Sequence, residues 1–198
     1  MFRAVDASRE LTRLLDDPGA FLDHPDPALR RMAVASLGPG RIASPAVSAR
    51  VRSLLSDDPE EAVRAAAAEA LAGCGAAALP ILVQAAAGAP PVVAEAIATA
   101  LGEIADPAAL PWLTTAAADH DDRLVREAAV AALGAIGDDS AVPVLVALAA
   151  DAPPQVRKRA IVALSVFDGP EVEAALRAAL EDRNPMVREA AEQVTGLG

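Results

Sequence analysis

The sequence predicts an all-α protein, a solenoid of about six helical hairpins that stack one on the next. Three observations predict this class: one phrase of residues returns at a nearly constant interval, a second apolar segment follows most copies, and alanine supplies much of the apolar content. The chain of 198 residues is 54% hydrophobic but only 2% aromatic. Alanine is the strongest helix former and costs no side-chain entropy, so this composition favours many helices in close contact.

The repeated phrase is Val-Arg, then alanines, then Leu-Gly and often Ile, and its clearest copy runs from Val125 to Ile136. The copies begin at Leu29, Val63, Val93, Val125, Val156 and Val187, which are 34, 30, 32, 31 and 31 residues apart. A period between about 20 and 50 residues is typical of solenoids, in which each unit buries its apolar face against its neighbours. The phrase therefore predicts six stacked repeats.

A second apolar segment accompanies the phrase, as in Ala109–Leu113 and Ala141–Leu148. Prolines near the start of such segments fit the first turn of a helix, and the turns rich in Asp, Asn and Ser fit helix N-caps. The predicted helix pairs are 8–16 with 27–37, 45–55 with 59–72, 76–87 with 90–104, 107–118 with 122–136, 140–149 with 153–167, and 171–181 with 185–197. We expect one domain, 1–198, with repeats at about 1–38, 39–73, 74–105, 106–137, 138–168 and 169–198.

The stretch from Asp121 to Leu148 resembles the short bacterial HEAT repeats that are called PBS-lyase-type HEAT-like repeats. It contains an acidic turn before Val-Arg-x-x-Ala, then Leu-Gly-x-Ile-Gly-Asp and Ala-Val-Pro-x-Leu, and weaker copies cover nearly the whole chain. The resemblance implies a right-handed α-α superhelix whose Val-Arg helices line a concave groove. It implies no single activity, because repeats of this kind serve many roles.

Helical periodicity identifies the residues that are free to face such a groove. When the copy from Val125 is turned by 100° per residue, Val125, Ala129 and Leu133 gather on one side, which we assign to the core. The third, sixth and seventh positions of the phrase lie on or beside the opposite face. Carried to the other copies, they predict a partner-binding groove of Arg31, Glu69, Glu95, Thr99, Glu127, Val130, Lys158, Ile161, Val162 and Glu189.

The arginine of the phrase recurs as Arg30, Arg64, Arg126, Arg157 and Arg188. One interpretation is a basic ladder for phosphate. The other, which we favour, is that each guanidinium pairs with acidic turn residues of its own or a neighbouring repeat and with free backbone carbonyls at the helix junction. A residue that recurs in most units is expected to serve the unit itself.

The net charge of −11 argues against nucleic acid, which needs a positive footprint, and against anionic membranes. It favours a protein or peptide partner that is basic or amphipathic. Ala76–Ala94 carries no charged residue, but its prolines and Gly88 predict two buried helices instead of a membrane span. The single cysteine, Cys74, suits a reducing compartment, and the first ten residues lack the apolar run of a signal peptide. We expect a cytoplasmic protein.

The sequence offers little for catalysis. His24 and His120 occupy the same turn of two different repeats, where we expect capping or solvated side chains, with weak cation binding as the alternative. We find no Cys-x-x-Cys, no His-Glu-x-x-His and no paired His-Glu motifs of the kind found in deoxyhypusine hydroxylases. We therefore predict no catalytic, cofactor or metal site, and a non-catalytic protein-binding scaffold or an assembly or regulatory factor. The alternative is a subunit of an enzyme like the bilin lyases or isomerases, which use similar repeats.

Overall fold

The computed structural model describes residues 2–196, with the side chains of 2–7, 39 and 151 left out. Over this range it contains thirteen α-helices, four short 3-10 helices and no strand, so the all-α prediction is confirmed. The α-helices are α1 (Phe2–Asp16), α2 (Pro27–Ala35), α3 (Pro39–Ile42), α4 (Pro45–Asp57), α5 (Glu61–Ala72), α6 (Leu79–Ala86), α7 (Pro91–Ile104), α8 (Leu110–Asp119), α9 (Arg123–Ile136), α10 (Val142–Asp151), α11 (Pro154–Leu164), α12 (Pro170–Ala179) and α13 (Pro185–Thr195). The 3-10 helices are η1 (Pro18–Phe21), η2 (Gly75–Ala78), η3 (Pro107–Ala109) and η4 (Asp139–Ala141).

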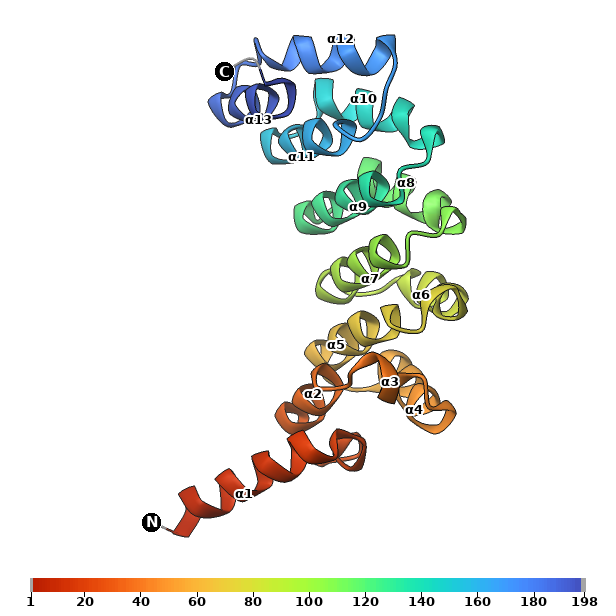
Figure 1. The fold of residues 1–198 in the computed structure, drawn as a ribbon, viewed down its shortest axis with the longest axis vertical. Helices are drawn as coiled ribbons and strands as arrows, with labels where there is room; N and C mark the ends of the chain where they lie inside the picture. The colour runs from red at the N-terminus through yellow and green to blue at the C-terminus, as the bar shows by residue number, and fades with distance from the viewer. Residues whose placement is uncertain (1, 197–198) are drawn as a thin grey trace. The chain divides into compact units, whose positions relative to one another are not determined.

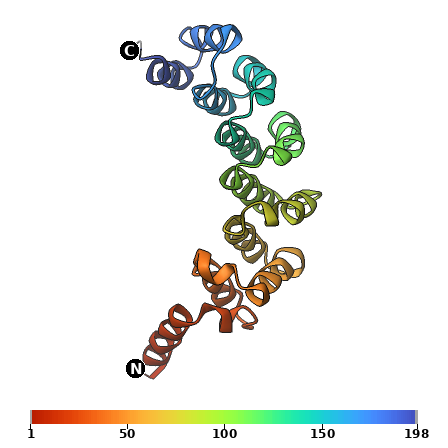
Figure 2. The same cartoon turned by 45° about the vertical axis from the view of Figure 1, so that its right-hand side comes forward.

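The helices form two compact units, Met1–Ala100 and Leu101–Gly198, and the boundary lies within α7. In the second unit, α9, α11 and α13 lie side by side in one layer, and α8, α10 and α12 form the other (Figures 1 and 2). In the first unit, α2 packs on α5 and α4 packs on both α5 and α6. Each unit is thus a stack of helical hairpins in which the second helices carry the Val-Arg phrase.

Local chemistry explains where these helices begin and end. Asp122 caps α9, because its carboxylate accepts hydrogen bonds from the backbone N–H groups of Leu124 and Val125. Gly137 ends the same helix in the left-handed conformation, with φ of 68°. The largest departure from the predicted boundaries is α1, which begins at Phe2 and not at residue 8. Residues 2–7 contain no Gly or Pro to stop the helix.

The ninth residue of the phrase provides the centre of the core. Leu71, Leu101, Leu133 and Leu164 occupy it, and each is 0% exposed. The next position sets how closely neighbouring helices approach in the second unit. A Cβ added to Gly134 would lie 2.9 Å from the Cβ of Ala163, and one added to Gly102 would lie 2.9 Å from the Cα of Ala132. Glycine at these positions therefore permits direct contact between helix backbones.

No helix in the described range 2–196 is long and apolar enough to cross a bilayer. The uncharged stretch Ala76–Ala94 is divided among η2, α6 and α7, with a left-handed Gly88, at φ of 75°, between the last two. The predicted interpretation of this stretch as two separate helices is confirmed.

Candidate functional site

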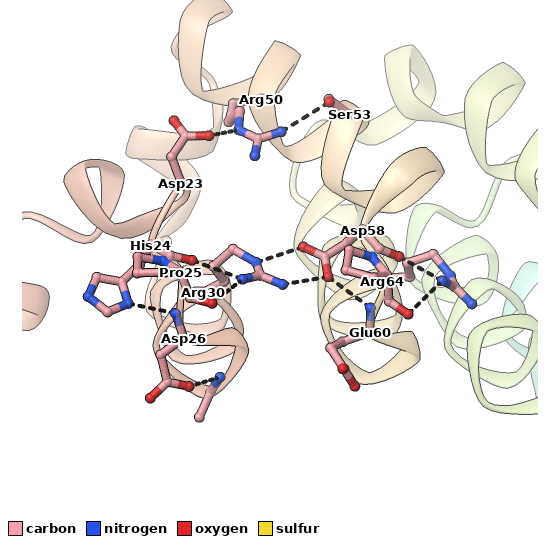
Figure 3. Close-up of polar contacts among 12 residues, drawn as sticks. Asp23, His24, Pro25, Asp26, Arg30, Arg50, Ser53, Asp58, Glu60 and Arg64 are labelled. Carbon is pink, nitrogen blue, oxygen red and sulfur yellow. Dashed lines mark hydrogen bonds and ion pairs between the residues drawn. The ribbon is translucent and has the colours of Figure 1, made fainter.

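The turn between α4 and α5 holds an ion pair that joins two repeats (Figure 3). Arg30 of α2 donates two hydrogen bonds to the Asp58 carboxylate, from Nε at 2.7 Å and from Nη2 at 2.8 Å. Its Nη1 donates to the backbone carbonyls of His24 and Pro25, in its own turn, at 2.9 and 3.1 Å. The Asp58 side chain is only 3% exposed, so the pair is a buried, two-pronged contact.

The second unit repeats this junction. Arg157 of α11 donates from Nε and Nη2 to the two carboxylate oxygens of Asp182, at 2.8 and 2.6 Å. Its Nη1 donates to the carbonyl of Ala152 at 2.8 Å, and its side chain is 1% exposed. For Arg30 and Arg157 the prediction of a structural pairing with a neighbouring turn is therefore confirmed.

The two carboxylates are held in their charged form. Burial opposes ionisation of Asp58, but the hydrogen bonds from Arg30 and from the Glu60 backbone N–H outweigh it and lower its pKa. The Arg157 hydrogen bonds are the main cause of the lowered pKa of Asp182, and burial only partly opposes them. Each pair consequently contributes stability only while its aspartate is ionised.

The two histidines take the turn-forming role of these aspartates. Asp58 accepts the backbone N–H of the residue two places on, Glu60, at 3.0 Å. In the equivalent turns His24 Nδ1 accepts the N–H of Asp26 at 3.1 Å, and His120 Nδ1 accepts that of Asp122 at 3.0 Å. The capping interpretation of both histidines is confirmed. Over the described residues no three His, Cys, Asp or Glu side chains group as metal ligands would.

In the first unit, the predicted groove residues lie on the Val-Arg helices α2, α5 and α7. Arg31, Glu69 and Thr99 are exposed and Glu95 is half-buried. Thr99 Oγ1 donates to the Glu95 carbonyl oxygen at 3.1 Å, so its hydroxyl is engaged by its own helix. The face that these helices present thus carries two carboxylates and one cation.

In the second unit, three predicted residues come together at a surface hollow of about 150 Å³. Glu127 of α9 and Lys158 and Val162 of α11 line it, with Gln155, Arg159 and Met186 completing the rim. We call these six residues the α9–α13 hollow. Glu127 also forms an ion pair with Arg123, one turn earlier on α9. Because that pair offsets its negative charge, Lys158 and Arg159 dominate the charge of the hollow. Glu189 is exposed on α13, outside this set.

The prediction that Val130 and Ile161 line the groove is wrong. Val130 and Ile161 are each 0% exposed, so neither contacts a partner on the surface. They occupy the sixth position of the phrase, and Val34 at that position is also 0% exposed. Within the stack a helix such as α11 packs against Val-Arg helices on both sides, here α9 and α13, which makes its buried arc wider than the one a single hairpin would need.

The prediction missed the residue directly before each Val-Arg pair. Gln155 and Met186 stand there and line the hollow, and Val92 and Leu124, at the same position, are 51% and 46% exposed. A comparison of this position across the six copies would have identified an exposed and largely apolar row. The helical wheel begins at the valine that follows this position, so the wheel does not include it.

The fold and the junctions define a class, a helical-repeat protein whose units are joined through turn residues. The model of the HEAT repeats family matches residues 15–91, 79–165 and 146–194. The chain belongs to the HEAT-repeat family, as its resemblance implied. No curated protein sequence matches it.

Solved structures with this fold include both natural and designed proteins. The complex of CpcE and CpcF of phycocyanin lyase from Nostoc sp. PCC7120 aligns with a TM-score of 0.66 and 25% identity, covering 75% of this chain and 99% of that chain. The Escherichia coli protein YibA aligns with a TM-score of 0.66 and 20% identity, over 89% of this chain and 67% of that one. A designed armadillo repeat protein in complex with the peptide (KR)4 aligns with a TM-score of 0.61 and 20% identity, over 92% and 98%.

Proposed function

We propose that the chain is a non-catalytic binding scaffold, or an assembly or regulatory factor, that recognises a segment of a partner protein through its Val-Arg helices. The observation that carries this proposal is the α9–α13 hollow, which gathers side chains from three successive repeats. A surface assembled from several repeats suits an extended or helical segment, because successive side chains of the segment meet successive helices.

The chemistry of the hollow suits an amphipathic segment. Val162 is 43% exposed and, with Met186, offers apolar contact, while Lys158 and Arg159 are exposed cations beside it. A helix with an apolar stripe flanked by acidic residues would satisfy both features. In the first unit, Glu69 and Glu95 favour basic side chains instead. An amphipathic segment with acidic residues beside its apolar stripe is therefore the proposed ligand of the α9–α13 hollow, in preference to a uniformly basic one.

A site-specific photo-crosslinker at Val162 tests the surface directly. We expect it to capture a discrete partner in the source cells, because the side chain is exposed beside the hollow. Ala174 on α12 is also exposed but belongs to the other helix layer, so the same group at Ala174 is the matched control. The same crosslinked species from both positions, or none from Val162, would remove the proposal.

Charge reversal tests the electrostatic part. Lys158→Glu combined with Arg159→Glu should weaken binding of the captured partner at least about tenfold if acidic residues face the hollow, since this replaces attraction with repulsion. Glu171→Lys with Glu173→Lys on α12 also shifts the charge by four, in the opposite direction, and serves as the control. Equal effects of both variants would mean that net charge, and not this surface, governs binding.

The likeness to the CpcE–CpcF complex supports a second candidate, a subunit of a bilin-lyase or isomerase-like enzyme. Its test is optical: a bilin mixed with the chain, alone and with a candidate partner subunit, would show a shifted absorbance band if the chain held it. A shifted band would favour this candidate. The α9–α13 hollow, at about 150 Å³, is smaller than common small-molecule sites of about 300–1,000 Å³, so a bilin would bind elsewhere on the chain.

A further inference from the structure

Arg64 differs from the other junction arginines in what the next repeat supplies. In most copies an aspartate stands five residues before the valine that begins the next copy. This residue is Asp58 for the copy with Arg30, Asp151 for the one with Arg126 and Asp182 for the one with Arg157. The same count after Arg64 reaches Gly88, and the turn from Ala87 to Pro90 contains no acidic residue at all. Among the four arginines that another copy of the phrase follows, Arg64 is therefore the one without an acidic residue in the following turn.

The guanidinium of Arg64 is nevertheless held in the same way as that of Arg30. Its Nη1 donates to the carbonyl of Asp58, in its own turn, at 2.7 Å, as Arg30 Nη1 does to His24. Figure 3 shows it across the Asp58 turn from Arg30. Within residues 2–196, its Nε and Nη2 have no hydrogen-bond acceptor, and the nearest carboxylate oxygen is Oε1 of the exposed Glu61, 3.9 Å from Nη2. At the junctions of Arg30 and Arg157, the same two nitrogens donate hydrogen bonds to the aspartate carboxylate.

A hollow of about 400 Å³ lies beside Arg64, at the junction of α4, α5, α6 and α7. Apolar side chains line part of it, among them Leu55, Ile81 and Val93, and polar groups line the rest, with Arg64 as its one charged residue. The hollow at the preceding junction is instead lined by charged groups, including Asp23, Arg50, Asp57 and Asp58. Arg64 thus lines a hollow with no carboxylate hydrogen-bonded to its Nε or Nη2 among the described residues, and only the long ion pair to Glu61 reaches Nη2. Arg30 and Arg157 each have a buried or half-buried aspartate at this place.

We propose that this hollow binds an Asp or Glu side chain of a partner polypeptide, whose carboxylate takes the place that Asp58 and Asp182 hold at the paired junctions. The planar guanidinium matches a carboxylate in two-pronged geometry, and Leu55, Ile81 and Val93 offer contact to neighbouring apolar side chains of the same segment. A site with a single cation suits one carboxylate better than the doubly charged phosphate group. This site is separate from the α9–α13 hollow, so either binding proposal can fail without the other.

The Nε–H resonances of the arginines, followed in a ¹H–¹⁵N spectrum of the full chain, give a direct readout. The probes are the acetylated, amidated tripeptides Leu-Asp-Leu and Leu-Asn-Leu, which differ only in charge, and inorganic phosphate. We expect Leu-Asp-Leu to shift the Arg64 resonance saturably and at least about tenfold more tightly than Leu-Asn-Leu, while the engaged Arg30 resonance stays in place. No shift, equal binding of the two peptides, or tighter binding of phosphate would overturn the proposal.

Gly88, at the counted position, is left-handed with φ of 75°, so the missing carboxylate is better supplied at Ala87, which is the C-cap residue of α6 as Asp58 is of α4. Ala87 is exposed and has φ of −67° and ψ of 105°, close to the −66° and 131° of Asp58, so an aspartate fits its backbone without strain. Ala87→Asp should move the Arg64 resonance without peptide and abolish peptide binding, whereas Ala87→Asn should do neither. Full peptide affinity in a folded Ala87→Asp protein whose Arg64 resonance has moved would contradict the proposal.

The charge control is Arg188, which donates to the Asp182 carbonyl at 2.8 Å as Arg64 does to that of Asp58. Arg64→Lys should remove the assigned resonance and weaken Leu-Asp-Leu binding about tenfold, because an ammonium lacks the two-pronged geometry. Arg188→Lys changes the same residue type in the same kind of turn and should leave peptide affinity unchanged. A loss of affinity in both variants would show that the effect is not specific to the hollow.

Discussion

The junction after Arg30 and the junction after Arg64 place their arginines in the same way but differ in the next turn, which supplies a carboxylate only to Arg30. Both guanidinium groups are positioned by a carbonyl of their own turn, at 2.9 and 2.7 Å. The next turn closes the first junction with the buried Asp58, while Ala87–Pro90 supplies no carboxylate to the second, which lies beside a hollow of about 400 Å³. The repeats still stack at the second junction, so the contact between hairpins does not require the ion pair. The core provides the stacking, and the pair adds stability and occupies a site that is otherwise available.

Asp58→Ala should have the largest effect on this comparison. It leaves the Arg30 side chain, 11% exposed, without a carboxylate, and breaking a buried pair in this way costs about 3–5 kcal/mol. Urea unfolding measures the loss. Asp57→Ala, at the exposed neighbouring position, is the control and should change the free energy of unfolding by less than about 0.5 kcal/mol. A small effect of Asp58→Ala would mean that the ion pair adds little to the free energy of unfolding.

Gly134→Ala comes next, because its Cβ would lie 2.9 Å from that of Ala163 and would push α9 and α11 apart. Overpacking of this kind costs about 1–3 kcal/mol, which thermal or urea unfolding would show. Gly38 stands at the same position of the phrase, but a Cβ there meets nothing within 4 Å. Gly38→Ala should be neutral or slightly stabilising, and equal losses at both sites would contradict the close packing of the second unit.

Acid should weaken the closed junctions selectively. The folded pKa values of Asp58 and Asp182 are lowered, so their contribution is complete above the ordinary carboxyl pKa of about 3.9 and is lost as the pH falls through the folded values. The melting temperature of the wild type should therefore fall more steeply below about pH 4 than that of the Asp58→Asn, Asp182→Asn variant. Parallel curves would mean that other carboxylates govern acid unfolding.

Ala87→Asp should have the smallest effect on stability, since Arg64 is partly exposed and ion pairs there contribute about 0.2–1 kcal/mol. We expect a gain of this size from the new pair. A double-mutant cycle with Arg64→Gln isolates the interaction from any other effect of the substitution. A coupling energy of zero would show that an aspartate at Ala87 does not reach the guanidinium.

Part of the candidate site followed from the sequence alone. Positions three and seven of the phrase led to Glu127, Lys158 and Val162, which line the α9–α13 hollow. The sixth position failed at Val130 and Ile161 because a helical wheel treats one helix at a time and does not include the second neighbour in a stack. Met186 is absent from the prediction because it precedes the phrase. The hollow beside Arg64 is absent because it depends on a carboxylate that the sequence lacks, and the motifs that we searched for consist of residues that are present.

The sequence by itself determined the repeat, its period, the helices and the core leucines such as Leu133. These depend on local propensity and on a periodic apolar pattern, which can be counted along the chain. Only the tertiary structure decided which arginine meets which carboxylate, how close Gly134 lies to Ala163, and that Arg64 lines a hollow. These contacts join residues about 25–30 positions apart, and they depend on how each hairpin is placed on the next, which no single helix encodes.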